Sequence, residues 1–112
     1  MKWSYGVTTV SERIETTLPK TLLSLAHAGF SNPHIFIDNA RIPPDSLEAY
    51  SCTCHCPPLR AFGNWVTSAW SLYVYVPDAD YYAIFQDDLI TYANLRDYLE
   101  RCKYPKTGYW NL

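Results

Sequence analysis

Two adjacent carboxylates, Asp87 and Asp88, follow the stretch Tyr81–Phe85 after a single intervening residue, Gln86, and that apolar stretch has the composition of a buried strand. Like charges at the mouth of a buried strand repel each other and lose hydration. A divalent cation would offset both costs, and Mg²⁺ and Mn²⁺ prefer carboxylate and phosphate oxygens as ligands. The pair therefore predicts a cation site. The alternative is that both residues cap a helix beginning near Thr91, since acidic residues are common before helices.

Polar residues also stand at the ends of two earlier strand-like runs, Trp3–Val10 and His34–Ile37. They are Thr8, Thr9, Ser11, Arg13, Asp38 and Asn39. In open parallel sheets, ligands bind outside the carboxyl ends of the strands. We therefore expect hydroxyls, amides and carboxylates from three strands to meet at one edge of a sheet.

Helices are predicted between these strands. Leu18, Leu22 and Leu25 recur at helical spacing, after a threonine at position 16 or 17 that can cap the helix. Two later helices are predicted from their apolar faces. These faces consist of Phe62, Trp65, Ala69, Leu72 and Val76, and of Tyr92, Leu95, Leu99 and Cys102. Short strands are also predicted near Tyr50–Thr53 and over Tyr109–Leu112.

The alternation of strands and helices predicts an α/β fold, with a mainly parallel sheet flanked by helices on both faces. In this arrangement Tyr81–Phe85 is expected to be a central strand, buried on both sides. The 112 residues are enough for a single domain, 1–112.

The composition narrows the classes of partner. Hydrophobic residues make up 48% of the chain and charged residues 18%, which is typical of a globular protein. The net charge of −2 gives no reason to expect nucleic acid or an anionic membrane as partner. No apolar run has the length of a membrane segment and no secretory signal is visible, so a cytoplasmic protein is expected. The high aromatic content, 16%, makes self-association through an exposed aromatic surface a further expectation.

Neither G-x-G-x-x-G nor G-x-x-x-x-G-K-[ST] occurs in the chain. The sequence therefore lacks both the dinucleotide fingerprint and the P-loop. Any phosphate group would have to be held mainly through a metal ion.

Four segments together resemble the nucleotide-binding half of a GT-A-fold glycosyltransferase. They are YGVTTVSER, FIDNA, LRAFGNWVTSAW and FQDDL. Such enzymes carry a first strand ending in threonine, an aspartate after the second strand, a Gly/Asn-containing helix entry beside the nucleotide, and a metal-binding DxD after the fourth strand. The resemblance covers nearly the whole chain. It implies that residues 1–112 form the incomplete N-terminal, donor-binding half of a GT-A domain.

By this resemblance, Asp88 is the direct ligand of Mn²⁺ or Mg²⁺. Asp87 lies near the ribose and sugar of the donor, or is a second ligand of the same metal ion. Asp38 contacts the base or ribose, while Thr8 and Thr9 line the base pocket. Other donor-binding residues are expected from the resemblance or from their place after a strand. They are Arg13, Asn39, Arg60, Gly63 and Asn64.

The implied activity is metal-dependent glycosyl transfer from a nucleotide-sugar to the hydroxyl of an unidentified acceptor. Two features depart from the family. Gln86 stands at the first position of DxD, and the family continues well past Leu112, where it supplies the acceptor site and, in inverting members, the catalytic base. No base is assigned in this chain. The alternative function is a nucleotide-binding or scaffold fragment without catalysis.

The segment CTCHC supports a third hypothesis, a zinc-dependent interaction module. Cys52, Cys54, His55 and Cys56 are potential zinc ligands, and Cys102 is the candidate for a distant fourth ligand if the three cysteines of this segment converge. Structural zinc sites usually use two separated ligand pairs, however, and alternate residues of an extended segment share one side. We therefore expect a loop with free thiols and no bound metal, in which the cysteines share one side and His55 points away.

Overall fold

A computed structural model describes residues 1–102 and 108–112. Four parallel strands form one sheet in the order β3-β2-β1-β4. The strands are β1 (Trp3–Val10), β2 (His34–Asp38), β3 (Cys52–His55) and β4 (Tyr81–Gln86). Three helices flank the sheet: α1 (Leu18–His27), α2 (Arg60–Tyr75) and α3 (Leu95–Arg101). Short 3₁₀ turns lie at Ser11–Arg13 and Asp45–Leu47. The predicted α/β fold with a parallel sheet is confirmed.

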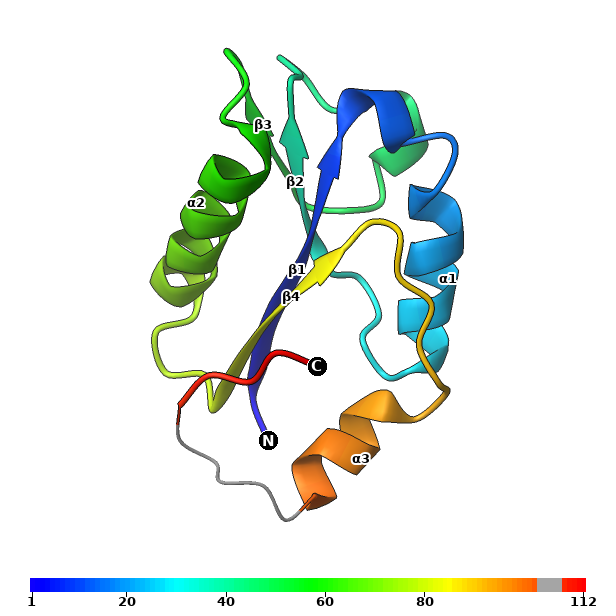
Figure 1. Ribbon diagram of the computed structural model, residues 1–112, viewed down its shortest axis with the longest axis vertical. Helices are drawn as coiled ribbons and strands as arrows, with labels where there is room; N and C mark the ends of the chain where they lie inside the picture. The colour runs from blue at the N-terminus through cyan, green and yellow to red at the C-terminus, as the bar shows by residue number, and fades with distance from the viewer. Residues whose placement is uncertain (103–107) are drawn as a thin grey trace.

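The helices cover both faces of the sheet (Figure 1), with α2 on one side and α1 on the other. α3 packs on the α1 side, since Leu99 joins the core cluster formed there. As predicted, α1 follows Thr17, which stands at its N-cap position, although the Thr17 hydroxyl makes no capping bond. Within residues 1–102 and 108–112, no helix is long and apolar enough to cross a membrane.

The hydrophobic core lies mainly between the sheet and α1. It contains Val7, Ile14, Leu18, Leu22, Leu25, Ala28, Phe30, Ile35, Ile37, Leu47 and Leu99. Alternate residues of β1 point to opposite faces of the sheet, because successive side chains of a strand do so. Val7 therefore packs with α1, whereas Ser4 donates a hydrogen bond of 2.9 Å to the carbonyl of Leu72 on α2.

The sheet–α2 layer is much more polar than the α1 layer. The buried residues of α2 are Asn64, Ser68 and Leu72, which follow helical spacing. Its large residues point outward instead, and Phe62 is 78% exposed and Trp70 66% exposed. The predicted buried face is therefore wrong at Phe62 and Trp65, which are both exposed, because the helix turns mainly small and polar side chains toward the sheet.

Three further predictions about elements are corrected. β4 is an edge strand with half-buried or exposed residues, not a central strand buried on both sides, because nothing in the described ranges pairs with its outer side. α3 begins at Leu95, so Asp87 and Asp88 are not at the start of a helix near Thr91. Tyr109–Leu112 is not a strand, since these residues form no ladder.

Candidate functional site at the carboxyl edge of the sheet

The candidate site lies at the point where the direction of the sheet reverses. From β1 the chain moves outward through β2 to β3, and β4 then returns to the other side of β1. Such a switch point leaves a crevice between two neighbouring strands at their carboxyl ends, where ligands of open α/β sheets bind. Here the crevice falls between the ends of β1 and β4, with Thr8 in register with Gln86.

Asp87 is the buried carboxylate of this crevice, with only 1% of its surface exposed. The Thr9 hydroxyl donates a hydrogen bond of 2.7 Å to its Oδ2 atom. The Arg13 Nε atom lies 3.2 Å from the same oxygen and forms an ion pair with it. A buried carboxylate is tolerated when it is paired and hydrogen-bonded. Thr9 and Arg13 therefore supply the partners that the sequence pattern left unassigned.

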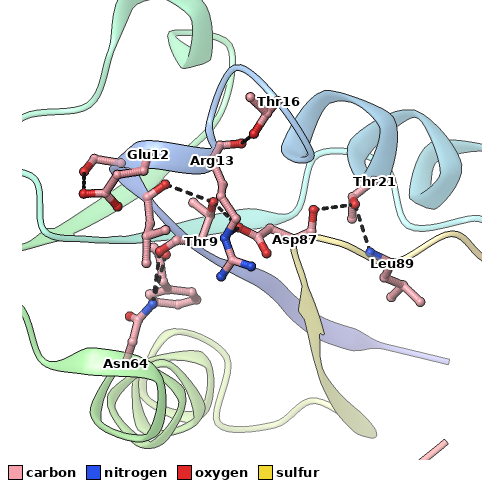
Figure 2. Close-up of polar contacts among 11 residues, drawn as sticks. Thr9, Glu12, Arg13, Thr16, Thr21, Asn64, Asp87 and Leu89 are labelled. Atoms are coloured by element: carbon pink, nitrogen blue, oxygen red, sulfur yellow. Dashed lines mark hydrogen bonds and ion pairs between the residues drawn. The ribbon is translucent and has the colours of Figure 1, made fainter.

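The backbone at Asp87 is fixed as well (Figure 2). The Thr21 hydroxyl on α1 donates a hydrogen bond of 2.7 Å to the Asp87 carbonyl and accepts one of 3.1 Å from the Leu89 N–H. Thr21 is 1% exposed. One hydroxyl thus holds the loop after β4 against α1 and sets the direction in which Asp88 leaves the sheet.

Arg13 is half-exposed and stands at the 3₁₀ turn that follows β1. Figure 2 shows its guanidinium beside Asp87, with the terminal nitrogens directed away from that carboxylate, toward the side on which Asn64 lies. A guanidinium has five N–H donors, so a single ion pair leaves donors for an anion. The neighbouring Glu12 has a lowered pKa, because its carboxylate accepts hydrogen bonds from its own backbone N–H and from the side chains of Asn39 and Ser11.

The Asp38 side chain binds backbone N–H groups at the start of α2. Its two carboxylate oxygens accept backbone hydrogen bonds from Leu59, at 2.7 Å, and from Arg60, at 2.8 Å. The side chain is 2% exposed. Carboxylates near a helix N-terminus satisfy free N–H groups and complement the helix dipole. Asp38 therefore ties β2 to α2, with both oxygens already accepting hydrogen bonds.

Asn64 connects α2 to the sheet. Its side-chain amide donates to the carbonyls of Phe36, at 3.3 Å, and Thr9, at 3.5 Å, and its Oδ1 atom lies 3.1 Å from the Nδ1 atom of His55. Asn64 is 3% exposed. The side-chain amide of Asn64 therefore makes its hydrogen bonds within the protein, between α2 and the sheet.

Asp88 differs from the other two carboxylates because it is exposed. Together with the exposed Gln86 it lines an open groove beside β4, whose other walls come from α2 and α3. Within the described ranges, no group of three or more His, Cys, Asp or Glu residues is arranged to hold a metal ion. A cation at Asp88 would therefore take most of its ligands from phosphate oxygens and water, which is the usual arrangement for Mg²⁺.

The remaining predicted donor-binding residues are dispersed around the edge. Thr8 is half-buried on the α2 face, opposite to Thr9. The exposed Asn39 donates to Glu12 at 2.8 Å. Arg60 and Gly63 lie in the first turn of α2, Arg60 exposed and Gly63 half-buried. The structure thus brings Thr9, Arg13 and Asp87 into direct contact and leaves these four at the periphery.

The cysteine-rich segment lies in β3 and just after it, so the expectation of a loop is wrong: Cys52–His55 pair with β2 as a strand. Cys52 and Cys54 face the core, where burial raises the pKa of both thiols, and the proximity of Cys54 raises that of Cys52 further. His55 faces α2 through Asn64, and Cys56 is exposed. The expectation that His55 points away from Cys52 and Cys54 is confirmed. All four cysteines are free thiols.

Thr21 and Glu12 are the site residues that the sequence pattern did not single out. Thr21 lies three positions after Leu18, on the predicted buried face of the first helix. A hydroxyl on an apolar helix face needs a hydrogen-bond partner when buried, and this was the available signal. Comparison of the chain with protein-family models, with curated proteins and with solved structures finds no match in any of the three.

Proposed function

We propose that the crevice between β1 and β4 binds the diphosphate part of a nucleotide-sugar together with Mg²⁺ or Mn²⁺, as the donor site of a glycosyltransferase. One observation carries the proposal. Arg13 follows β1 and Asp88 follows β4, the two strands on either side of the switch point, and the Arg13 guanidinium is half-exposed while the Asp88 carboxylate is exposed. A cation–diphosphate complex needs a carboxylate to bind the cation and a positively charged group to bind the phosphates, and these two residues supply them.

The donor set fits such a cation. Asp88 offers one exposed carboxylate, and Mg²⁺ sites commonly use one or two carboxylates with substrate phosphates and water. Asp87 is already paired with Thr9 and Arg13, so Asp88 is the better of the two expected ligands. When bound, the cation would supply Lewis-acid stabilisation of the charge on the departing diphosphate.

The residues of the chain then have separate tasks. Arg13 donates hydrogen bonds to the diphosphate, because guanidinium groups match phosphate oxygens in geometry and charge. Asp87 holds Arg13 in the crevice through the ion pair of 3.2 Å. Thr21 holds the loop that carries Asp88. The acceptor hydroxyl attacks the anomeric carbon of the sugar, and no residue is assigned as its base.

Calorimetric titration of UDP and GDP, each with and without Mn²⁺, tests the proposal. We expect the wild-type chain to bind at least one nucleotide only when Mn²⁺ is present. Asp88→Asn should weaken that binding by about tenfold or more, equivalent to about 1.4 kcal/mol, and abolish the dependence on Mn²⁺. The free energy of unfolding of this variant should hold or rise, since it removes one of two neighbouring like charges.

Asp97→Asn is the matched control. It removes the same charge from an exposed residue of α3, which pairs with Arg101 on the same helix and does not follow a strand of the sheet. Nucleotide binding by this variant should equal that of the wild type. Equal binding by Asp88→Asn and wild type, or none by the wild type, would contradict the proposal. Binding without release of UDP from a nucleotide-sugar would favour the non-catalytic scaffold instead.

A further inference from the structure

The outward face of α2 carries a continuous apolar surface. Phe62, Val66 and Trp70 recur every fourth position and Tyr73 follows three positions later, so all four lie on one side of the helix. The ring of Tyr73 has its centroid 5.9 Å from that of Trp70 and 5.9 Å from that of Tyr82 on β4. These five side chains are called the α2 band below.

The α2 band is large for the surface of a small domain. Phe62 is 78% exposed and Trp70 66% exposed, and the exposed fractions of the other three side chains lie between 40% and 49%. Since an aromatic side chain has about 150–250 Å² to bury, the band exposes roughly 550 Å². Patches near the top of the usual range for monomers often mark interaction sites.

The surroundings of the α2 band contain no charge that could select a charged partner. Residues 61–77, which include nearly all of α2, have no charged side chain. A charged group placed against the centre of the band would lose its hydration and find no opposite charge there. The surface that complements the band is therefore uncharged and apolar, as the band itself is.

The spacing along α2 makes this face complementary to itself. Two helices pack along seams in which apolar residues alternate in steps of three and four, and α2 has such a seam at Phe62, Val66, Ala69 and Tyr73. In an antiparallel pair with a two-fold axis at the midpoint of α2, Phe62 would lie opposite Tyr73 of the second copy and Val66 opposite Ala69. Rings then meet near the two ends of the seam and small side chains near the axis, where the helices can approach closely. A lipid surface would cover the band but would gain nothing from this match.

The charges that follow α2 favour the antiparallel orientation. Asp78 and Asp80 are exposed beside Lys2, whose Nζ atom lies 2.8 Å from an Asp78 carboxylate oxygen, so this end of the helix has an excess of negative charge. A parallel pair would bring two such ends together. An antiparallel pair separates them by the length of the 16-residue helix, about 24 Å, and places each helix N-terminus beside a C-terminus.

We propose that the α2 band is the interface between two copies of this chain, with their α2 helices antiparallel about a two-fold axis. The two bands together bury roughly 1,100 Å², just above the area of about 1,000 Å² that a specific interface needs. An interface of this size corresponds to a dissociation constant on the order of tens of micromolar, so the chain is mainly monomeric at about 1 µM and unfolding at that concentration reports on the monomer. The interface is separate from the proposed nucleotide site and does not depend on it.

Sedimentation equilibrium between about 1 and 500 µM tests the proposal and should show a reversible monomer–dimer equilibrium. Val66→Glu should raise the dissociation constant at least tenfold, because it places two like charges close to the two-fold axis. Leu23→Glu is the matched control, since it makes a similar change at a 61% exposed residue of α1, on the other side of the sheet (Figure 1), and should leave the equilibrium unchanged. Both positions are exposed, so the fold is kept, and thermal unfolding at about 1 µM checks this.

A charge-exchange experiment tests the orientation. Phe62→Lys and Tyr73→Glu should each weaken dimerisation at least tenfold alone, and an equimolar mixture of the two variants should form a heterodimer at least tenfold more tightly than either variant associates with itself. The reason is that position 62 of one copy lies opposite position 73 of the other. Phe62→Lys mixed with Phe62→Glu combines the same charges and should not recover dimerisation, because the two substituted positions are far apart in an antiparallel pair.

Four outcomes would overturn the proposal. A wild-type chain that remains monomeric at about 500 µM would exclude the dimer. Equal losses for Val66→Glu and Leu23→Glu would place the contact elsewhere. Recovery only in the mixture of the two Phe62 variants would refute the antiparallel arrangement. Flotation of the monomeric wild-type chain with phosphatidylcholine vesicles, lost in Val66→Glu, would identify a lipid surface as the occupant of the α2 band.

Discussion

At the scale of single residues, Asp87 and Asp88 are neighbours with opposite situations. Asp87 is buried and its Oδ2 atom contacts both Thr9 and Arg13, while Asp88 is exposed. Their side chains differ in this way because adjacent residues at a strand end point in different directions. Substitution of the two residues should therefore affect different properties of the protein.

Asp87→Asn should lower the free energy of unfolding by about 1.5–3 kcal/mol, the usual value of hydrogen bonds that involve a charged group. The amide cannot form the ion pair with Arg13, and it presents an N–H group to the buried Thr9 hydroxyl if it takes the wrong orientation. Urea unfolding followed by tryptophan fluorescence measures this loss. Thr9→Val, which keeps the volume and removes one hydroxyl, should cost less. An Asp87→Asn variant as stable as wild type would show that the buried ion pair contributes nothing to folding.

At the scale of elements, the packing of α2 shows why its sequence pattern predicted the wrong buried face. Aromatic residues at helical spacing normally indicate the face turned to the core. In α2 the sheet beneath the helix is already filled, since Phe36 of β2 covers Gly6 of β1 so closely that a Cβ atom at Gly6 would lie 2.7 Å from its ring. Small and polar residues such as Ser68 therefore fit between α2 and the sheet, and the aromatic residues point outward.

Substitutions on the two faces of α2 should differ sharply in cost. Phe62→Gln should change the free energy of unfolding by no more than about 0.5 kcal/mol, because the ring is 78% exposed. Leu72→Ala should cost about 2–5 kcal/mol, because Leu72 is 2% exposed and leaves a cavity. Thermal and urea unfolding of both variants measure the difference. A larger loss for Phe62→Gln than for Leu72→Ala would mean that α2 packs by its aromatic face after all.

At the scale of the whole molecule, the two layers differ in how they are held. The α1 layer rests on a continuous apolar cluster, whereas the α2 layer depends on hydrogen bonds from Asp38 and Asn64 and on a few apolar contacts. Local opening is governed by the apolar contacts that must be broken. The sheet thus carries one mainly apolar layer and one layer held to a larger extent by hydrogen bonds.

Native-state hydrogen exchange should show this asymmetry. Amides of α2 should exchange through openings of lower free energy than those of α1, and Asp38→Ala should lower the α2 values further while α1 changes only with global stability. The reason is that Asp38 satisfies two N–H groups at the start of α2. Mass spectrometry of peptides from each helix measures the rates. Equal protection of α1 and α2 in wild type would contradict the prediction.

The parallel sheet, its helices on both faces and the polar carboxyl edge could all be predicted from the sequence, because they follow from local periodicity and from the polar residue at each strand end. The position of β4 at the edge of the sheet could not be predicted, because an apolar strand has the same sequence pattern at an edge as in the centre of a sheet. Nor could the contacts of Asp87 be predicted. Thr9 and Thr21 lie 78 and 66 positions away in the chain, and only the folded arrangement brings them together.

The pairing of β1 with β4 has a consequence for the order of events on the ribosome. Thr9 emerges 78 positions before Asp87, a delay of roughly 4–16 s at about 5–20 residues per second. During that interval β1 can pair with β2 on one side only, so its other edge is open and the crevice does not exist. The nascent chain therefore passes through a stage in which one edge of β1 is unpaired, and such an edge pairs readily with other chains.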